Sequence, residues 1–259
     1  MILARTPLSK REEAIKTLVR QSYQDPKVVA RYTAVGLWPA EEILILEHVP
    51  NDARVLDIGC GAGRTTVALA ELGLHVHGTD ISPAMVQIAR QQAELAKVRS
   101  EYSVMDAMEL AVPDQSYEVA FYSYNGIELV PGIRGKLRVM AEVWRVLRKG
   151  GYFIFSSHSF FAFNKYLPGR LFGVLKYGAG RLAGLPVMEA EFGERFIDDD
   201  LEEVKYLQVL PPSTWIRMLK STGYELCYFN NRKRIESGRN LSFMGQFEAG
   251  ERFYVARKN

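Results

Sequence analysis

Three carboxylates and a run of glycines could together hold a nucleoside-bearing ligand. Asp57 closes an aliphatic run, Asp80 follows it by 23 residues, and Asp106 comes later by a similar interval. Three glycines at alternate positions stand just after the first acid: Gly59, Gly61 and Gly63. Glycines let backbone N–H groups approach a ligand closely, and carboxylates accept hydrogen bonds from ribose hydroxyls or a base amine. This pattern predicts a nucleotide-like ligand.

Alternating strands and helices are expected to position these groups. The pattern predicts strands at 54–58, 74–79, 101–105, 117–122 and 152–156, with helices at 63–72, after Ser82-Pro83 and at 135–147. The last helix is expected to bury a stripe that comprises Leu137, Met140, Ala141, Trp144 and Leu147. The ligand crevice of such a sheet lies at the carboxyl ends of its strands, where all three acids fall.

The fold class is therefore predicted to be α/β. We expect a Rossmann-like, doubly wound, mainly parallel seven-stranded sheet in a single domain of residues 1–259. Its parts would be a helical N-terminal lid (1–50), a ligand-binding core (51–159), an acceptor-side insertion after the fifth strand (160–210), and a C-terminal helix with the last strands (211–259).

Four stretches resemble the class I S-adenosylmethionine (SAM)-dependent methyltransferases over roughly residues 50–160: VLDIGCGAGR, TDISPAMVQIAR, MDAMEL and VLRKGGYFIFSS. The resemblance implies a methyltransferase with SAM as cofactor. It implies that Asp80 binds the ribose diol, with Ile81 against the adenine and Asp106 at the adenine edge. The full set of implied cofactor-binding residues is Asp57, Gly59, Cys60, Gly61, Gly63, Asp80, Ile81, Asp106, Ala107 and Ser123.

A dinucleotide-binding Rossmann domain is the main competing interpretation. Its fingerprint requires a third glycine where this chain has Arg64, and it gives Asp106 no role. Cys60 within the turn is not favoured as a nucleophile, because the donor would occupy the turn. The methyl-donor interpretation is therefore preferred.

Methyl transfer from a sulfonium is an in-line displacement, so the enzyme positions the acceptor and, where needed, removes its proton. His158, at the exit of the fifth strand, is the candidate catalytic base, although it could instead cap the strand or bind the acceptor without taking a proton. Tyr32, Tyr124 and Asn125 are the candidate substrate-binding residues. Aromatic packing within the lid is the simpler interpretation of Tyr32 itself.

The net charge, the cysteines and the lack of long apolar runs limit which partners and locations are expected. The formal net charge is only +3, from 33 basic and 30 acidic residues, so a nucleic-acid partner is not favoured. Two cysteines make no disulfide framework, no cluster has metal-ligand spacing, and the early polar N-terminus does not look like a signal peptide. No apolar run is long enough for a transmembrane helix. A cytoplasmic location is expected, and the oligomeric state cannot be read from the sequence.

The insertion is expected to shape the acceptor site. Its basic residues Lys165, Arg170, Lys176 and Arg181 suggest membrane-surface or anion binding, but they form no single stripe, so an aromatic-lined pocket is preferred. The leading hypothesis is methyl transfer to O or N of a small aromatic, sugar or lipid-like acceptor. Methylation of RNA or protein, and a non-catalytic SAM-binding sensor or partner subunit, remain alternatives.

Overall fold

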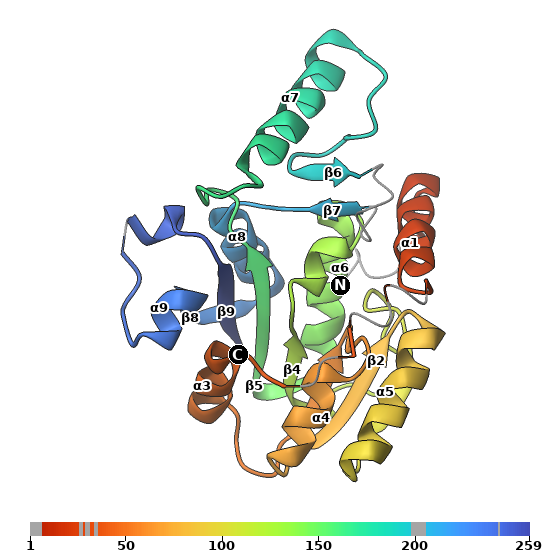
Figure 1. The fold of residues 1–259 in the computed structure, drawn as a ribbon, viewed down its shortest axis with the longest axis vertical. Helices are drawn as coiled ribbons and strands as arrows, with labels where there is room; N and C mark the ends of the chain where they lie inside the picture. The colour runs from red at the N-terminus through yellow and green to blue at the C-terminus, as the bar shows by residue number, and fades with distance from the viewer. Residues whose placement is uncertain (1–6, 26–27, 29–31, 34–35, 198–205, 243) are drawn as a thin grey trace.

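A seven-stranded sheet organises the computed structural model, which describes residues 7–25, 28, 32–33, 36–197, 206–242 and 244–259 (Figure 1). Its strand order is β3-β2-β1-β4-β5-β9-β8. The strands are β1 (Arg54–Ile58), β2 (His75–Asp80), β3 (Glu101–Val104), β4 (Tyr117–Tyr122), β5 (Leu147–His158), β8 (Tyr224–Asn231) and β9 (Glu251–Lys258). The first five pair in parallel, whereas β9 runs antiparallel to both β5 and β8. The predicted mainly parallel, doubly wound fold is confirmed.

Helices cover both faces of the sheet because its central strands are apolar on both sides. Val55 and Val119 point to the face covered by α3 (Pro39–His48) and α4 (Arg64–Glu71), and the short α9 (Arg232–Glu236) lies on the same face. The next residue along each strand, Leu56 and Ala120, points to the opposite face, which is covered by α6 (Gly132–Val146) and α8 (Pro212–Thr222). Near the edge of the sheet that β3 and β2 form, α5 (Pro83–Ala96) packs against α4, β2 and β3.

Local capping signals explain where two helices begin. Ser9 caps α1 (Lys10–Ser22), and the Glu12 side chain reaches back to the Ser9 backbone in a complete capping box. The Ser82 hydroxyl accepts a hydrogen bond from the Met85 N–H at the start of α5, and Pro83 takes the first helical position. In both helices a serine, a favoured capping residue, stands directly before the first helical residue.

The sequence-based assignment of α6 was wrong in three respects: its start, its buried stripe and its end. The helix begins at Gly132, and its buried stripe consists of Val139, Met140, Val143 and Val146. Trp144 lies at the rim with 36% of its surface exposed, where Lys258 contacts its ring. Apolar residues occur on both sides of Met140, so helical spacing alone could not select the face that meets the sheet. Leu147, expected to end the helix, opens β5 instead.

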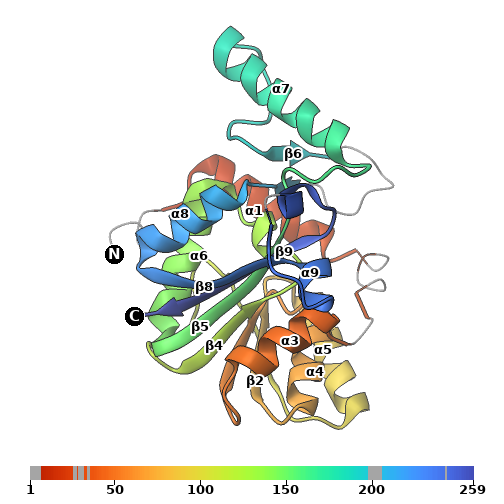
Figure 2. The ribbon, with the colours of Figure 1, turned by 90° about the vertical axis from the view of Figure 1, so that its left-hand side faces the viewer.

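The insertion forms a small layer beyond the carboxyl edge of the sheet. It contains α7 (Leu167–Ala183) and a two-stranded antiparallel sheet of β6 (Glu194–Phe196) and β7 (Tyr206–Gln208). Two perpendicular views show α7 projecting away from the body, on the far side of β6 (Figures 1 and 2).

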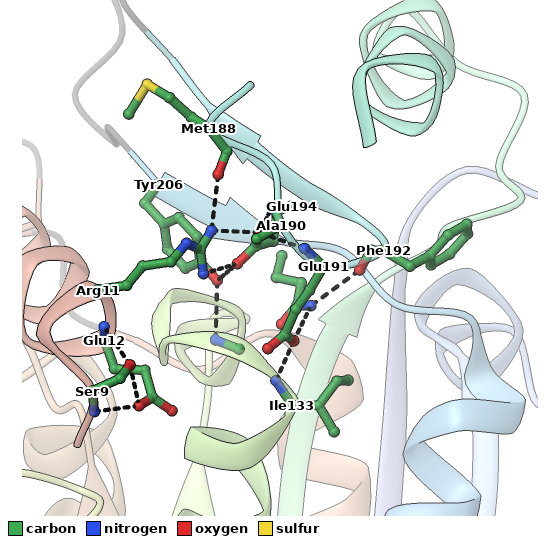
Figure 3. Close-up of polar contacts among 12 residues, drawn as sticks. Ser9, Arg11, Glu12, Ile133, Met188, Ala190, Glu191, Phe192, Glu194 and Tyr206 are labelled. Carbon is green, nitrogen blue, oxygen red and sulfur yellow. Dashed lines mark hydrogen bonds and ion pairs between the residues drawn. The ribbon is translucent and has the colours of Figure 1, made fainter. Parts of the chain in front are cut away.

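Buried polar contacts anchor the insertion to α1 and α6 (Figure 3). The Arg11 guanidinium binds both carboxylate oxygens of Glu194 at 3.0 and 2.6 Å, and the Tyr206 hydroxyl donates to the same carboxylate at 3.1 Å. The Ile133 N–H, in the first turn of α6, donates to Glu191 at 2.7 Å. The Glu194 side chain is fully buried, so losing Arg11 would leave an uncompensated buried charge, at a cost of about 3–5 kcal/mol.

Candidate functional site

A cavity of about 430 Å³ lies over the glycine turn at the carboxyl edge of the sheet. Gly59, Gly61 and Gly63 all have positive φ, between 54° and 90°. At Gly59 a Cβ would stand 2.7 Å from the Tyr122 ring, and at Gly63 it would stand 3.1 Å from the backbone of Ala89. At Gly61 it would meet nothing within 4 Å. Two glycines therefore let the turn pack closely, and the third keeps the cavity open.

Asp57 lies beneath this turn and is fully buried. The Thr66 hydroxyl donates to its Oδ2 at 2.6 Å, whereas its Oδ1 has no hydrogen-bond partner among the described residues. Burial raises the pKa of Asp57 to about 7, because the Thr66 hydrogen bond only partly offsets the lost hydration. A buried carboxylate oxygen without a partner is suited to receive a donor or a positive charge from a ligand.

Asp80, the last residue of β2, links the turn to the next helix. Its Oδ2 accepts the Gly61 N–H at 2.9 Å, and its Oδ1 accepts the Ser82 N–H at 2.8 Å. Burial raises the pKa of Asp80, and the two N–H donors act against that rise. The carboxylate lines the cavity, with Ile81 beside it.

Asp106 lines the same cavity just beyond β3, with Ala107 next to it. Its Oδ1 accepts the Met108 N–H at 2.8 Å, and its Oδ2 lies 3.3 Å from the Lys16 Nζ of α1. The sequence did not single out Lys16, because nothing in the pattern of α1 shows which strand end that helix will cross.

Arg64 ties the segment above the cavity to the core. Its guanidinium makes a two-pronged contact with the fully buried carboxylate of Glu41, at 2.9 and 2.8 Å, and donates to the Gly36 carbonyl at 2.6 Å. The rings of Trp38 and Tyr124 flank it, each 5.3 Å away. Arg64, which stands where a dinucleotide fingerprint requires glycine, therefore holds residues 36–41 over the cavity.

A second cavity, of about 500 Å³, adjoins the first on the side of the insertion. The two cavities share part of their lining: Tyr23, Tyr32, Trp38, Tyr124 and Leu129. Asn164, Tyr166 and Arg170 reach the second cavity from the insertion, and Arg195 reaches it from β6. Aromatic rings thus form the boundary between the cavities, and charged groups gather on the far side.

His158, Glu128 and Asn125 form a hydrogen-bonded cluster in the second cavity. His158 Nδ1 lies 2.5 Å from the buried Glu128 carboxylate, and Asn125 Nδ2 lies 3.3 Å from His158 Nε2. The carboxylate on Nδ1 and the amide donor on Nε2 select the tautomer with the proton on Nδ1. The nearby Glu128 carboxylate raises the pKa of His158, because it favours the charged imidazolium.

The chain adopts a left-handed turn where β4 ends. Tyr124 and Asn125 have φ values of 53° and 60°, and left-handed backbone is uncommon for a bulky residue such as tyrosine. The Asn125 N–H donates to the Ser156 hydroxyl at 3.0 Å. This turn sends the Tyr124 ring over the boundary between the cavities and the Asn125 amide toward His158.

Most residues singled out from the sequence come together here. Those lining the first cavity are Gly59, Cys60, Gly61, Asp80, Ile81, Asp106, Ala107, Ser123, Tyr32 and Tyr124. Asn125 and His158 line the second. Asp57 and Gly63 lie behind the turn. Sequence reasoning missed Glu128, although an acid six residues beyond the end of β4 was a usable signal. It also missed Arg195, for which the sequence held no signal.

This fold and this site define a class of protein that binds a nucleoside-bearing ligand over a glycine turn. Residues 55–151 match the methyltransferase domain family. The chain is 25% identical over 194 residues to YqeM of Bacillus subtilis, a methyltransferase-like protein, covering 69% of this chain and 76% of YqeM.

It is 30% identical over 105 residues to a ubiquinone biosynthesis O-methyltransferase of Xanthomonas campestris, covering 40% of this chain and 43% of the relative. A solved SAM-dependent methyltransferase from Methanosarcina mazei shares the fold, with a TM-score of 0.66 and 23% identity over 86% of this chain and 99% of that one. The matched domain, the relatives and the fold show a SAM-dependent methyltransferase whose cofactor is SAM.

The residues over the glycine turn fit SAM. Open space at Gly61, an unpartnered Asp57 oxygen and two strand-end carboxylates that line the cavity suit a cationic ligand with a ribose and an adenine. No helix in the described ranges is long and apolar enough to cross a membrane.

Proposed function

We propose that this enzyme methylates a hydroxyl oxygen of a small, largely apolar acceptor held in the second cavity, with His158 as the general base. The observation that carries the proposal is the cluster of His158, Glu128 and Asn125 beside the donor cavity. A hydroxyl group must lose its proton as it accepts a methyl group, and a neutral imidazole is suited to take it.

Each member of the cluster has a separate role in this proposal. SAM supplies the electrophilic methyl group, while the residues of the chain orient the acceptor and move its proton. Glu128 holds the Nδ1 proton and stabilises the imidazolium, which leaves Nε2 to face the acceptor. The Asn125 amide, 3.3 Å from Nε2, would give up this contact to the acceptor hydroxyl. Asp80 and Asp106 would bind the ribose and the adenine of the donor.

Two further features support an apolar hydroxylated acceptor. Tyr32, Trp38, Tyr124 and Tyr166 give the second cavity aromatic walls, which suit a planar or lipid-like molecule. The Xanthomonas relative is an O-methyltransferase of ubiquinone biosynthesis. The chain spans less than half of that relative, so the acceptor is inferred chiefly from the cavity.

The proposal is tested by methyl transfer from radiolabelled SAM to a catechol that carries a short isoprenoid tail. His158→Ala should lower kcat by about 100-fold or more, with the affinity for S-adenosylhomocysteine unchanged. His75→Ala is the matched control, because His75 is exposed at the start of β2, at the end away from Asp80 and the cavities. Equal rates for the His158 variant and the wild type would refute the role of His158 as base.

A further inference from the structure

The helix α7 has its large apolar side chains on the outside. Leu171, Leu175 and Leu182 are 53%, 68% and 91% exposed. At 100° per residue they fall within one narrow sector of the helix, and Phe172, 59% exposed, extends it. A surface helix of a soluble protein normally turns such residues toward the core.

The face that α7 turns toward the protein contains Gly169 and Gly173, beside the buried Arg170. A Cβ at Gly169 would stand 2.8 Å from the Arg195 guanidinium, and one at Gly173 would stand 3.0 Å from the Glu194 carbonyl oxygen. These glycines let the helix lie close against β6. The leucine sector is thus left on the outward side of a helix that stands clear of the body in both views (Figures 1 and 2).

The exposed charges beside this face are mainly basic. Residues 160–188 contain four basic residues and no acidic one: Lys165, Arg170, Lys176 and Arg181. Of these, Arg170 is buried, and Lys176 lies 3.4 Å from the buried carboxylate of Glu189. The whole chain carries a formal net charge of only +3, so the remainder is nearly neutral. Lys176 and Arg181 flank the leucine sector on the wheel. The exposed aromatic residues Phe163 and Tyr166 lie just before the helix.

We propose that α7 and residues 160–166 form a docking surface for an anionic lipid bilayer, with α7 lying in the interface. An apolar face flanked by cations and aromatic rings suits the boundary between anionic headgroups and acyl chains. A second copy of the chain fits less well. Pairing α7 with α7 would bring Lys165 and Arg181 of both copies together without acidic partners from residues 160–188.

The docking surface is continuous with the second cavity, because Asn164, Tyr166 and Arg170 belong to both. Docking would therefore place that cavity next to the lipid, where an apolar acceptor dissolves. This consequence depends on the proposed function, whereas the docking surface itself does not. Vesicle binding requires no acceptor and no methyl transfer, so the two proposals can fail separately.

The test is flotation of the full-length chain with vesicles of phosphatidylcholine containing about one third phosphatidylglycerol. We expect flotation that weakens as salt is raised, and little flotation with phosphatidylcholine alone. The triple variant Leu171→Gln, Leu175→Gln and Leu182→Gln should bind about 100-fold more weakly or worse. The matched control is Leu46→Gln, Leu72→Gln and Leu95→Gln, which replaces leucines of comparable exposure on other helices and should float like the wild type.

A second arm tests the charges. Lys165→Gln with Arg181→Gln should weaken binding to the anionic vesicles about 10-fold, whereas Arg99→Gln with Lys149→Gln should not. S-adenosylhomocysteine binding checks that each variant is folded. If the triple variant fails this check, Leu182→Gln alone replaces it, and we expect binding about 5-fold weaker.

Three results would overturn the proposal. The wild type could fail to float with anionic vesicles, or the α7 variant and its control could float equally. Alternatively, sedimentation could show a dimer or a protein complex that the α7 substitutions dissociate while vesicle binding is absent. That last result would assign the face to protein association.

Discussion

The two cavities differ in how widely their lining residues are spread along the chain. The donor cavity takes half of its lining residues from one region of the chain, between Ile58 and Met108. The second cavity, proposed to hold the acceptor, gathers residues from Tyr23 to Glu251, with contributions from both the insertion and β9. The donor is common to a whole family of enzymes and is bound by a compact motif, whereas the acceptor site can change with the segments around it.

The largest effect on the donor cavity is expected from Asp80→Ala. Asp80 is proposed to accept two hydrogen bonds from the ribose, so without it the affinity for S-adenosylhomocysteine should fall about 100-fold or more by calorimetric titration. Asp114→Ala, which alters an exposed carboxylate outside both cavities, should leave the affinity unchanged. Full affinity in the Asp80 variant would mean that the donor is held elsewhere.

Glu128→Gln should affect the acceptor side alone. The carboxylate raises the pKa of His158 above its ordinary 6.5. The wild-type kcat should therefore rise with pH and level off above that raised pKa, since only neutral imidazole accepts a proton. In the variant, kcat should level off at a lower pH and fall about 10-fold or more, because the imidazolium loses its stabilising charge. Glu225→Gln, at an exposed position of β8, serves as the control. An unchanged inflection would show that Glu128 does not control the titration.

Lys136→Met probes how the insertion is held. Lys136 is buried in α6 and donates to the Val130 carbonyl at 2.6 Å and to Gln208 of β7 at 2.9 Å. Burial lowers the pKa of Lys136 to about 7. The unfolded chain then binds more protons between about pH 7 and 10, so the free energy of unfolding should rise with pH across that range.

In the Lys136 variant that rise should shrink, by about 3–4 kcal/mol between the two ends of the range. Urea unfolding at several pH values measures it. Lys149→Met, at an exposed site, should keep the wild-type slope. A variant that also keeps this slope would show that Lys136 is charged in the folded protein.

The smallest effect is expected from Lys16→Met. The Lys16–Asp106 contact is 3.3 Å long and partly exposed, so it should contribute less than about 1 kcal/mol. The dissociation rate of S-adenosylhomocysteine should change no more than about 5-fold, and added salt should reduce the difference. A 100-fold change would mean that α1 controls the donor cavity far more strongly than this ion pair implies.

Most residues predicted to bind the donor line one cavity, because the sequence signals that located them are local; their role in binding stays a prediction. The alternating glycines and the acids lie directly at strand ends, so they reach the same edge of the sheet once β1 to β3 form. It predicted His158 but not Glu128, because that pairing depends on the left-handed turn at Tyr124. It could not show that the leucines of α7 point outward, since periodicity gives the apolar face of a helix and not what covers it. The stripe of α6 was misplaced for the same reason.

The helix α1 has a consequence for engineering new acceptor specificity. Lys16 reaches over the donor cavity, while Arg11, less than two turns away, binds Glu194 in the insertion. One short helix therefore joins two regions that are far apart in sequence. A chimaera that exchanges only residues 160–210 would carry Glu194 away from its guanidinium partner. The modular unit to transplant is discontinuous: the insertion together with the helix that begins at Lys10.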